Sequence, residues 1–136
     1  MQTKAALSRD DVARILTAAR EEALRNGWAV SIAVVDDGGH PLALERLDGC
    51  APIGAYLCVE KARTSALGRR ESKGYEDMIN GGRNAFLSVP VMTGMLEGGV
   101  PVVVGGQVAG AVGVSGVKPD QDAQVARAGA VAVQAG

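Results

Sequence analysis

The sequence predicts an α+β fold in which helices cover an antiparallel sheet, and three observations support this prediction. Two pairs of apolar runs are joined by glycine-rich turns, which is typical of β-hairpins. Three other stretches repeat apolar residues at helical spacing, so each offers one face to a core. Hairpins pair antiparallel strands, and amphipathic helices need a sheet to cover. Because single domains peak at roughly 100–150 residues, we expect one domain over residues 1–136.

The first half of the chain predicts a helix followed by a hairpin. The helix is expected over residues 9–26, because Ser8 can cap its start and Gly27 suits its left-handed end. Strands are expected over residues 28–35 and 40–47, since the string DDGG between them is a turn signal. The first strand is β-branched and apolar, which predicts burial. The proline near the start of the second suits the first residue or the edge of a sheet.

The second half predicts the same kinds of element. A helix is expected over residues 52–67, with a proline in its first turn. A second hairpin is expected from strands at residues 100–104 and 107–114, which flank a Gly-Gly turn. A final helix is expected to start at Asp120 or Asp122, because acidic residues favour the positive end of a helix.

The composition excludes several classes of protein. A formal net charge of −1 and an aromatic content of 3% argue against nucleic-acid binding. Apolar runs are too short for a membrane span or a signal peptide, so we expect a cytoplasmic protein that meets no membrane. Cys50 and Cys58 are eight residues apart, and His40 is the only histidine, so no metal site is expected. Both cysteines are expected in the core, and His40 on the surface of its hairpin.

The helix at residues 52–67 carries the first candidate site. Tyr56, Glu60 and Arg63 are spaced i, i+4 and i+7, so they share one stripe of the helix, and Lys61 lies beside it. Glu60 would be a better general acid if it bordered a pocket, because burial favours the protonated form. The alternative is a solvated helix face on which Glu60 and Arg63 form an ion pair.

The polar segment at residues 68–84, which we expect to be irregular, carries the second candidate site. Its arginines include Arg70 and Arg83, and a guanidinium can grip a carboxylate with two parallel hydrogen bonds. Tyr75 adds a neutral donor to the same segment. Long irregular segments inside compact domains are often functional, but a charged surface loop is the alternative.

Glycine-rich strings near the end of the chain offer a weaker signal. The string GGQVAG precedes a predicted strand and not a helix, so it supports neither a P-loop nor a dinucleotide fingerprint. Backbone N–H groups at Ser115 and Gly116, between a strand and a helix, could form an anion-binding nest. A plain turn is the alternative at that position.

Three longer strings carry a family resemblance. They are SIAVVDDGGHPLALERLDG at 31–49, EKART at 60–64 and GGVPVVVGGQVAGAVGVSG at 98–116. Together they resemble the GlcG/HbpS family of haem-degrading-domain proteins. The resemblance implies a profilin-like fold with an antiparallel sheet of about five strands flanked by helices. It also implies homo-oligomers with ligand pockets near the subunit contacts.

The string GRRESKGYEDMINGGR at 68–83 resembles the branch of this family formed by hydroxylaminobenzoate lyases. We therefore expect a lyase, free of cofactors, that converts a carboxylated arylhydroxylamine to a catechol and ammonia. Glu60 would donate the proton, Tyr75 would be a second donor, and Arg70 or Arg83 would bind the substrate carboxylate. Further residues expected to bind this aromatic substrate are Tyr56, Lys61, Arg63, Ser115 and Gly116.

The family resemblance also implies an alternative function, a haem-binding or haem-sensing protein without turnover. The low aromatic content and the single imidazole weigh against haem, so no tight haem site that depends on His40 is expected. A third alternative is a structural companion protein of a catabolic operon. Haem binding would separate these readings, because bound haem adds a Soret band to the absorbance spectrum.

Overall fold

The computed structural model describes residues 1–133, and a sheet with the strand order β2-β1-β4-β3 lies at its centre. All three pairs of neighbouring strands are antiparallel. The strands are β1 (Ser31–Asp36), β2 (Pro41–Arg46), β3 (Gly99–Val104) and β4 (Gln107–Ser115). The helices are α1 (Arg9–Asn26), α2 (Pro52–Gly68), α3 (Lys73–Asn80) and α4 (Pro119–Ala130), with short 3-10 turns η1 (Asn84–Ser88) and η2 (Val131–Val133).

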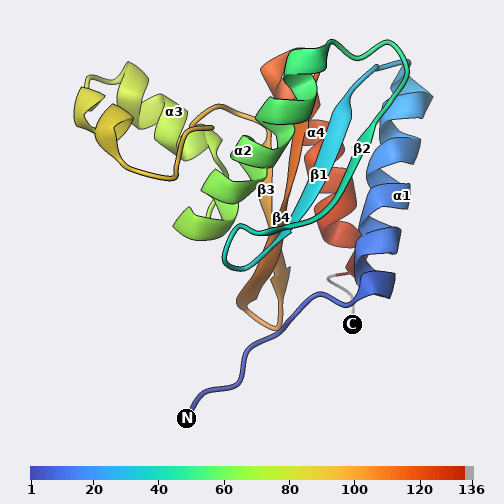
Figure 1. Cartoon of the computed structure of the whole chain (residues 1–136), viewed down its shortest axis with the longest axis horizontal. Helices are drawn as coiled ribbons and strands as arrows, with labels where there is room; N and C mark the ends of the chain where they lie inside the picture. Colours follow the sequence, from blue (N-terminus) through green and yellow to red (C-terminus); the bar gives the residue numbers. More distant parts are fainter. Residues whose placement is uncertain (134–136) are drawn as a thin grey trace.

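The helices lie in layers on the two faces of the sheet, with α2 on one face and α1 and α4 on the other (Figure 1). The larger core lies under α1 and α4, where branched side chains such as Ile15, Ile32 and Val112 are fully buried. Under α2 the core consists of small residues, including Ala62 and Cys58. Small side chains let α2 lie close to the sheet, which matters for the site described below.

The prediction of an α+β fold with an antiparallel sheet is confirmed, but the count of about five strands is wrong. The described residues form four strands, which are the two hairpins that the turn signals predict. Strand β1 starts at Ser31 and not at Trp28, because the Trp28 N–H closes the end of α1 by donating to the Ala23 carbonyl. The final helix starts one residue before Asp120, at Pro119, a residue suited to a first helical turn.

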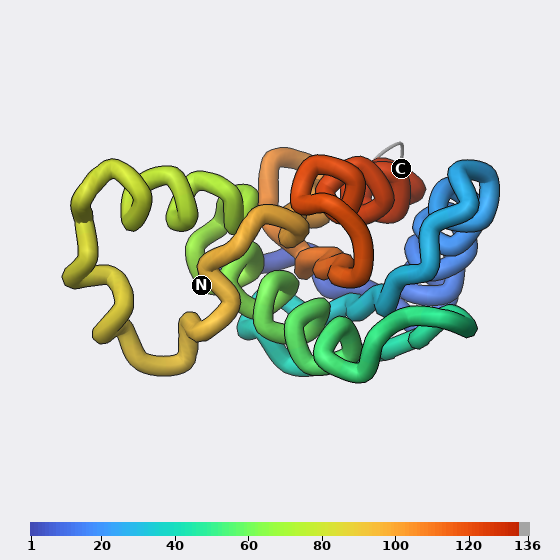
Figure 2. Tube along the Cα trace, turned by 90° about the horizontal axis from the view of Figure 1, so that it is seen from above, coloured from blue at the N-terminus to red at the C-terminus, as the bar shows by residue number. Residues whose placement is uncertain are grey.

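The predicted irregular segment at 68–84 contains a helix that the sequence analysis missed. Helix α3 and turn η1 project from the body as an arm, defined here as residues 73–88 (Figures 1 and 2). Ser72 anchors the base of the arm to β3, since its N–H donates to the Gly99 carbonyl and its Oγ accepts from the Gly99 N–H. No residue of α3 or η1 is buried, so the arm has little core of its own.

Both cysteines are free and buried, as predicted. Burial raises the pKa of the Cys58 thiol to about 12, so this thiol stays protonated at neutral pH. Among residues 1–133, no helix combines the length and the apolar character that crossing a membrane requires.

Candidate functional site

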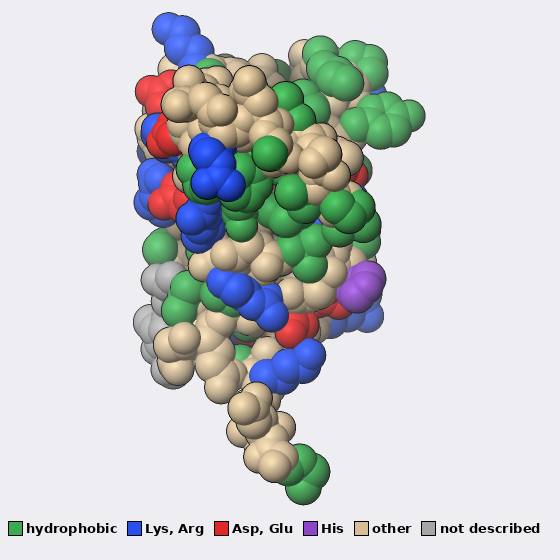
Figure 3. Space-filling model, turned by 90° about the vertical axis from the view of Figure 1, so that its left-hand side faces the viewer, with side chains coloured by type: hydrophobic (Ala, Val, Ile, Leu, Met, Phe, Trp, Pro, Cys, Tyr) green, Lys and Arg blue, Asp and Glu red, His purple; other side chains and the backbone are tan. Residues whose placement is uncertain are grey.

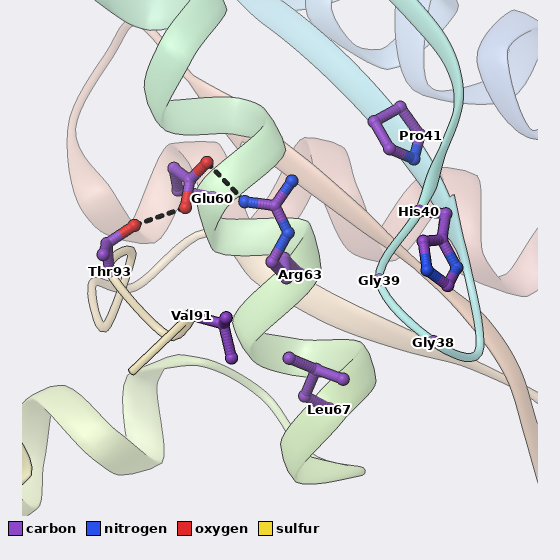
Figure 4. A pocket seen from close by; sticks show the side chains of 9 residues that line it. All are labelled: Gly38, Gly39, His40, Pro41, Glu60, Arg63, Leu67, Val91 and Thr93. Carbon is purple, nitrogen blue, oxygen red and sulfur yellow. Dashed lines mark hydrogen bonds and ion pairs between the residues drawn. The ribbon is translucent and has the colours of Figure 1, made fainter. Parts of the chain in front are cut away.

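A cavity of about 520 Å³ opens between α2, the turn that joins β1 to β2, and the segment before β3 (Figure 4). Small-molecule pockets in proteins have volumes of roughly 300–1,000 Å³, so this hollow has the size of a ligand site. Its walls are partly apolar, with Pro41, Leu67 and Val91 beside two glycines of the turn. The lining residues are Gly38, Gly39, His40, Pro41, Glu60, Arg63, Leu67, Val91 and Thr93.

Glu60 and Arg63 form the polar part of the cavity wall that α2 provides. Arg63 Nη1 donates to Glu60 Oε1 over 2.6 Å, and Thr93 Oγ1 donates to Glu60 Oε2 (Figure 4). The two side chains of the pair are each 28% exposed. The predicted alternative of a Glu60–Arg63 ion pair is therefore present, but the pair lines a cavity and not an open helix face.

His40 lies at the rim of the same cavity, on the β1–β2 turn (residues 37–40). Its Nδ1 lies 3.0 Å from Asp36 Oδ1 and 3.1 Å from Oδ2, which leaves Nε2 without a hydrogen bond among the described residues. Figure 3 shows the imidazole at the edge of an area of hydrophobic side chains, with acidic side chains on its other side. The ring is therefore oriented by a carboxylate and exposed at its far nitrogen, where it could contact a ligand.

The Asp36 carboxylate, at the end of β1, organises the turn that follows it. The backbone N–H groups of Gly38 and His40 each donate to Asp36 Oδ1 over 2.9 Å. Burial alone would raise the pKa of Asp36, but the N–H groups of His40 and Gly38 and the imidazole outweigh it and lower the pKa overall. The carboxylate therefore keeps its charge at neutral pH and below.

The other residues predicted on or near α2 do not line this cavity. Tyr56 shares the stripe of Glu60 but is 75% exposed. Lys61 faces the opposite way and is buried, where its Nζ donates to Asp122 Oδ2 over 3.1 Å and to the Val114 carbonyl over 3.0 Å. This buried pair ties α2 to α4, which is a structural role.

Ser115 and Gly116 lie near the start of α2, away from the cavity. The Ser115 carbonyl is 3.6 Å from Cys50 Sγ, and a Cβ at Gly54 would lie 3.0 Å from the same carbonyl oxygen. Gly116 packs against the backbone of Ala29 and Val30. The N–H of Val117, which follows Gly116, donates to Asp122 Oδ1 over 3.1 Å, so a carboxylate of the chain itself already lies beside this backbone.

The predicted residues of the polar segment form a separate cluster on the arm and its base. The Arg70 guanidinium lies 4.1 Å from the centre of the Tyr75 ring, and Tyr75 meets Phe86 edge to face with centroids 5.6 Å apart. Arg83 stacks on Phe86 at 5.2 Å. The structure therefore does not bring Tyr75, Arg70 and Arg83 together with Glu60 around the cavity described above.

The arm borders a second, smaller hollow of about 240 Å³. Its walls come from α3, η1 and the segment before β3, and it shares Thr93 with the larger cavity. The lyase hypothesis requires α2 and residues 68–84 to face one cavity. In this chain they face neighbouring hollows on either side of Thr93.

Two features of the larger cavity escaped the sequence analysis. One is Thr93, which no motif singled out. The other is the contact of His40 with the cavity, for which Asp36, four residues earlier and before two glycines, was the available signal. An aspartate in that position often accepts hydrogen bonds from the turn that follows it.

The fold and the cavity together define a small α+β domain with a ligand-sized hollow beside one helix. The model of the HbpS-like family, described as haem degrading protein HbpS-like, matches residues 7–131. The chain therefore belongs to this family, which confirms the resemblance that the sequence motifs carry. Protein GlcG of Escherichia coli K12 is 64% identical over 115 residues, which cover 85% of each chain.

Solved structures support the same assignment. A double mutant of HbpS from Streptomyces reticuli superposes with a TM-score of 0.89 at 29% identity, over 98% of this chain and 90% of that one. A complex of PduOC with haem superposes with a TM-score of 0.82 at 24% identity, over 95% and 96% of the two chains. The second likeness is one of fold, and haem is bound to PduOC in that complex.

Proposed function

We propose that this protein binds haem in the larger cavity, where the His40 imidazole would hold the iron. The observation that carries the proposal is the geometry at His40. A histidine that binds a metal through one ring nitrogen usually donates from the other to a carboxylate, which orients the ring and raises its basicity. Asp36 provides that carboxylate at Nδ1, His40 lines the rim of the cavity, and its side chain is 79% exposed.

The remaining lining residues suit the other parts of haem. The macrocycle is flat and apolar, and Pro41, Leu67 and Val91 offer apolar contacts around the cavity. Haem also carries two carboxylates. Arg63 uses only Nη1 in its described hydrogen bonds, so its other N–H groups remain for a carboxylate. No three His, Cys, Asp or Glu side chains gather into a metal cluster in residues 1–133, but haem iron needs only axial ligands from the protein.

Bound haem would supply an iron centre for ligand binding or redox chemistry. The chain would orient the imidazole through Asp36 and hold a carboxylate through Arg63. Related proteins also support this proposal, since the family is described as haem degrading and PduOC forms a complex with haem. They favour the haem-binding alternative over the lyase. The carboxylate at His40 is the reason that we now propose this residue as a haem ligand, against the expectation from the sequence.

The lyase reading stays a prediction without further support. Glu60 lines the cavity, but Tyr75 and both proposed clamps, Arg70 and Arg83, lie on or next to the arm. None of the relatives named above is described as a lyase. We therefore propose no second function.

Titration with haemin tests the proposal. Wild-type protein should give a sharp Soret band that saturates at about one haemin per chain. His40→Ala should weaken binding by at least about tenfold and change the spectrum, because it removes the axial ligand. Tyr56→Phe is the matched control, since Tyr56 is exposed and phenolate is another haem ligand, and it should behave like the wild type.

Two outcomes would count against this assignment. Wild-type protein that leaves the haemin spectrum unchanged would refute haem binding. A His40→Ala protein that binds haemin with the affinity and spectrum of the wild type would refute the axial ligand.

A further inference from the structure

We propose that Arg69 is a positioning residue that holds the β1–β2 turn, and with it His40, at a set place against α2. The inference rests on the proposed haem site, because it assigns a role in shaping that site. Arg69 does not line the cavity. It lies at the end of α2, and it acts through the turn that carries the imidazole.

The backbone of Arg69 has a conformation that an arginine rarely adopts. Arg69 follows the last residue of α2 with φ 57° and ψ 34°, in the left-handed region. Helices often end in this conformation, but usually with glycine, because a Cβ makes it unfavourable. A residue kept in such a conformation suggests a function for its side chain.

The glycine that precedes Arg69 cannot take this position. Gly68 is the last residue of the helix, and a Cβ there would lie 2.5 Å from Tyr75 Oη. The close packing of the Tyr75 ring therefore explains the glycine at 68. The left-handed position therefore falls to Arg69. The contacts of its side chain must offset the unfavourable backbone conformation.

The side chain of Arg69 bridges the end of α2 and the β1–β2 turn. Its Nη1 donates to the Ala66 carbonyl over 2.9 Å and to the Asp37 carbonyl over 2.5 Å. Its Nη2 lies 3.8 Å from Asp37 Oδ2, which also accepts from Lys4 Nζ over 3.0 Å. Asp37 is thus held through both its backbone and its carboxylate.

The turn has few other contacts that could hold it to α2. It contains Gly38 and Gly39, the second with φ 82°, so its backbone is intrinsically free. Gly39 packs against Arg63, where a Cβ would lie 2.8 Å from Arg63 Cγ. Residues of α2 form one wall of the cavity and the turn forms the facing wall (Figure 4). A guanidinium that joins the two elements therefore sets the width of the cavity.

The position of His40 follows from the same contacts. Asp36, which binds the imidazole, is the neighbour of Asp37, which binds Arg69. Movement of Asp37 would turn the Asp36 carboxylate and the imidazole with it. Arg69 therefore controls where Nε2 points, although it touches neither the imidazole nor the cavity.

The substitution Arg69→Gly tests this role because glycine suits the left-handed backbone and removes the side chain that contacts the turn. Its melting temperature should stay close to that of the wild type. Arg69→Lys keeps a cation but lacks the planar fork, so it should rescue only part of the effect. Arg70→Ala is the matched control, since the neighbouring Arg70 stacks on Tyr75 and has no described contact with the turn.

The first readout uses the protein without haem. The N–H groups of Gly38, Gly39 and His40 are all hydrogen-bonded inside the turn. Their hydrogen exchange should be about tenfold faster in Arg69→Gly, since local opening controls exchange. Exchange in β4 should not change, and Arg70→Ala should match the wild type throughout. Unchanged exchange at the turn, or faster exchange across the whole sheet, would overturn the proposal.

The second readout is the electron paramagnetic resonance spectrum of haemin bound to each variant. The wild type and Arg70→Ala should give one narrow set of signals, and Arg69→Gly a broadened set from several imidazole orientations. An identical spectrum for Arg69→Gly would overturn the role toward haem. If wild-type protein binds no haemin, the proposed function fails, and hydrogen exchange still decides whether Arg69 holds the turn.

Discussion

In the proposed haem site, the Asp36 carboxylate would orient the His40 imidazole before the metal binds. The aspartate accepts two backbone N–H groups and the imidazole, so its position is determined by the turn itself. Asp36→Asn should weaken haemin binding by about 10–100-fold, the usual effect of losing a carboxylate partner of a ligating histidine. Asp48→Asn, at an exposed position outside the cavity, is the control. Equal haemin affinities for both variants would contradict the role of Asp36.

The buried pair of Lys61 and Asp122 supports a prediction about stability. Their side chains are 5% and 3% exposed, so either charge would be costly without its partner. Lys61→Met should lower the free energy of unfolding by about 3–5 kcal/mol. The double variant Lys61→Met with Asp122→Leu should recover most of this loss, because it removes both charges. Urea unfolding measures both values.

The same pair gives a dependence on pH. Burial raises the pKa of Asp122, and the Lys61 ammonium opposes that rise, so Lys61→Met should raise the pKa further. A carboxyl with a higher pKa in the folded state stabilises the protein at low pH, and this contribution is lost as the pH rises through the folded-state pKa. The destabilisation of Lys61→Met should therefore be smaller at about pH 5 than at about pH 7. A destabilisation by Lys61→Met that is larger at about pH 5 than at about pH 7 would contradict this prediction.

The sequence could predict Glu60 and Arg63 at one site but not the burial of Lys61. Spacing determines which side chains share a stripe of a helix, and Glu60 and Arg63 do meet at a cavity wall. It does not say which stripe faces the sheet when a helix is apolar on most sides, as α2 is. Lys61 points to the sheet because the small residues around it let the helix approach closely.

At the scale of elements, that close approach depends on glycines of the sheet, among them Gly113 of β4. A Cβ at Gly113 would overlap the Cys58 carbonyl of α2 and lie 2.5 Å from the Ala62 nitrogen. Gly113→Ala should therefore push α2 from the sheet and lower the free energy of unfolding by about 3 kcal/mol, the upper range of overpacking.

The control for this prediction is Gly105→Ala, in the turn between β3 and β4. Nothing lies within 4 Å of a Cβ there, and only the backbone φ of 56° resists it. Its cost should be about 1 kcal/mol. Similar losses for both variants in urea unfolding would show that α2 tolerates displacement.

The hairpins were predictable, whereas α3 was not. Turn residues such as DDGG and Gly105-Gly106 determine the backbone of the turn itself. They therefore indicate a hairpin whatever the position of its strands in the sheet. Helix α3 has eight residues, a glycine near its start and no buried side chain. Its apolar residues Tyr75, Met78 and Ile79 stand at helical spacing but span only about one turn, too short a run to distinguish a helix from a polar loop. Its position also depends on the contact of Ser72 with β3, which is distant in sequence.

At the scale of the molecule, the cavity lies beyond prediction from sequence. Its walls come from residues 38–41, 60–67 and 91–93, which only the fold brings together. The motifs mark the first two of these stretches as family features without saying that they face each other. The contact between them is tertiary, and Arg69 contributes to it from the string at 68–83, which gives no sign of a contact with the turn.

Association of several copies is the expectation that concerns the whole surface. Large apolar side chains are exposed on α2 and on β2, where Ile53 is 59%, Tyr56 75% and Leu44 47% exposed. Leu44 pairs with Ala33, which packs under α2, so Leu44 lies on the α2 face of the sheet. Apolar residues gathered on one face commonly mark an interface between proteins.

Light scattering at micromolar protein should therefore give a mass at least twice the 13.9 kDa of the chain. Leu44→Glu should lower this mass toward that of one chain, because the substitution places a charge in the apolar area. Leu24→Glu is the matched control, since Leu24 is 62% exposed on α1, on the other side of the sheet, and its mass should not change. A wild-type mass of one chain would contradict the expectation. A lower mass for Leu24→Glu alone would move the interface to the α1 face.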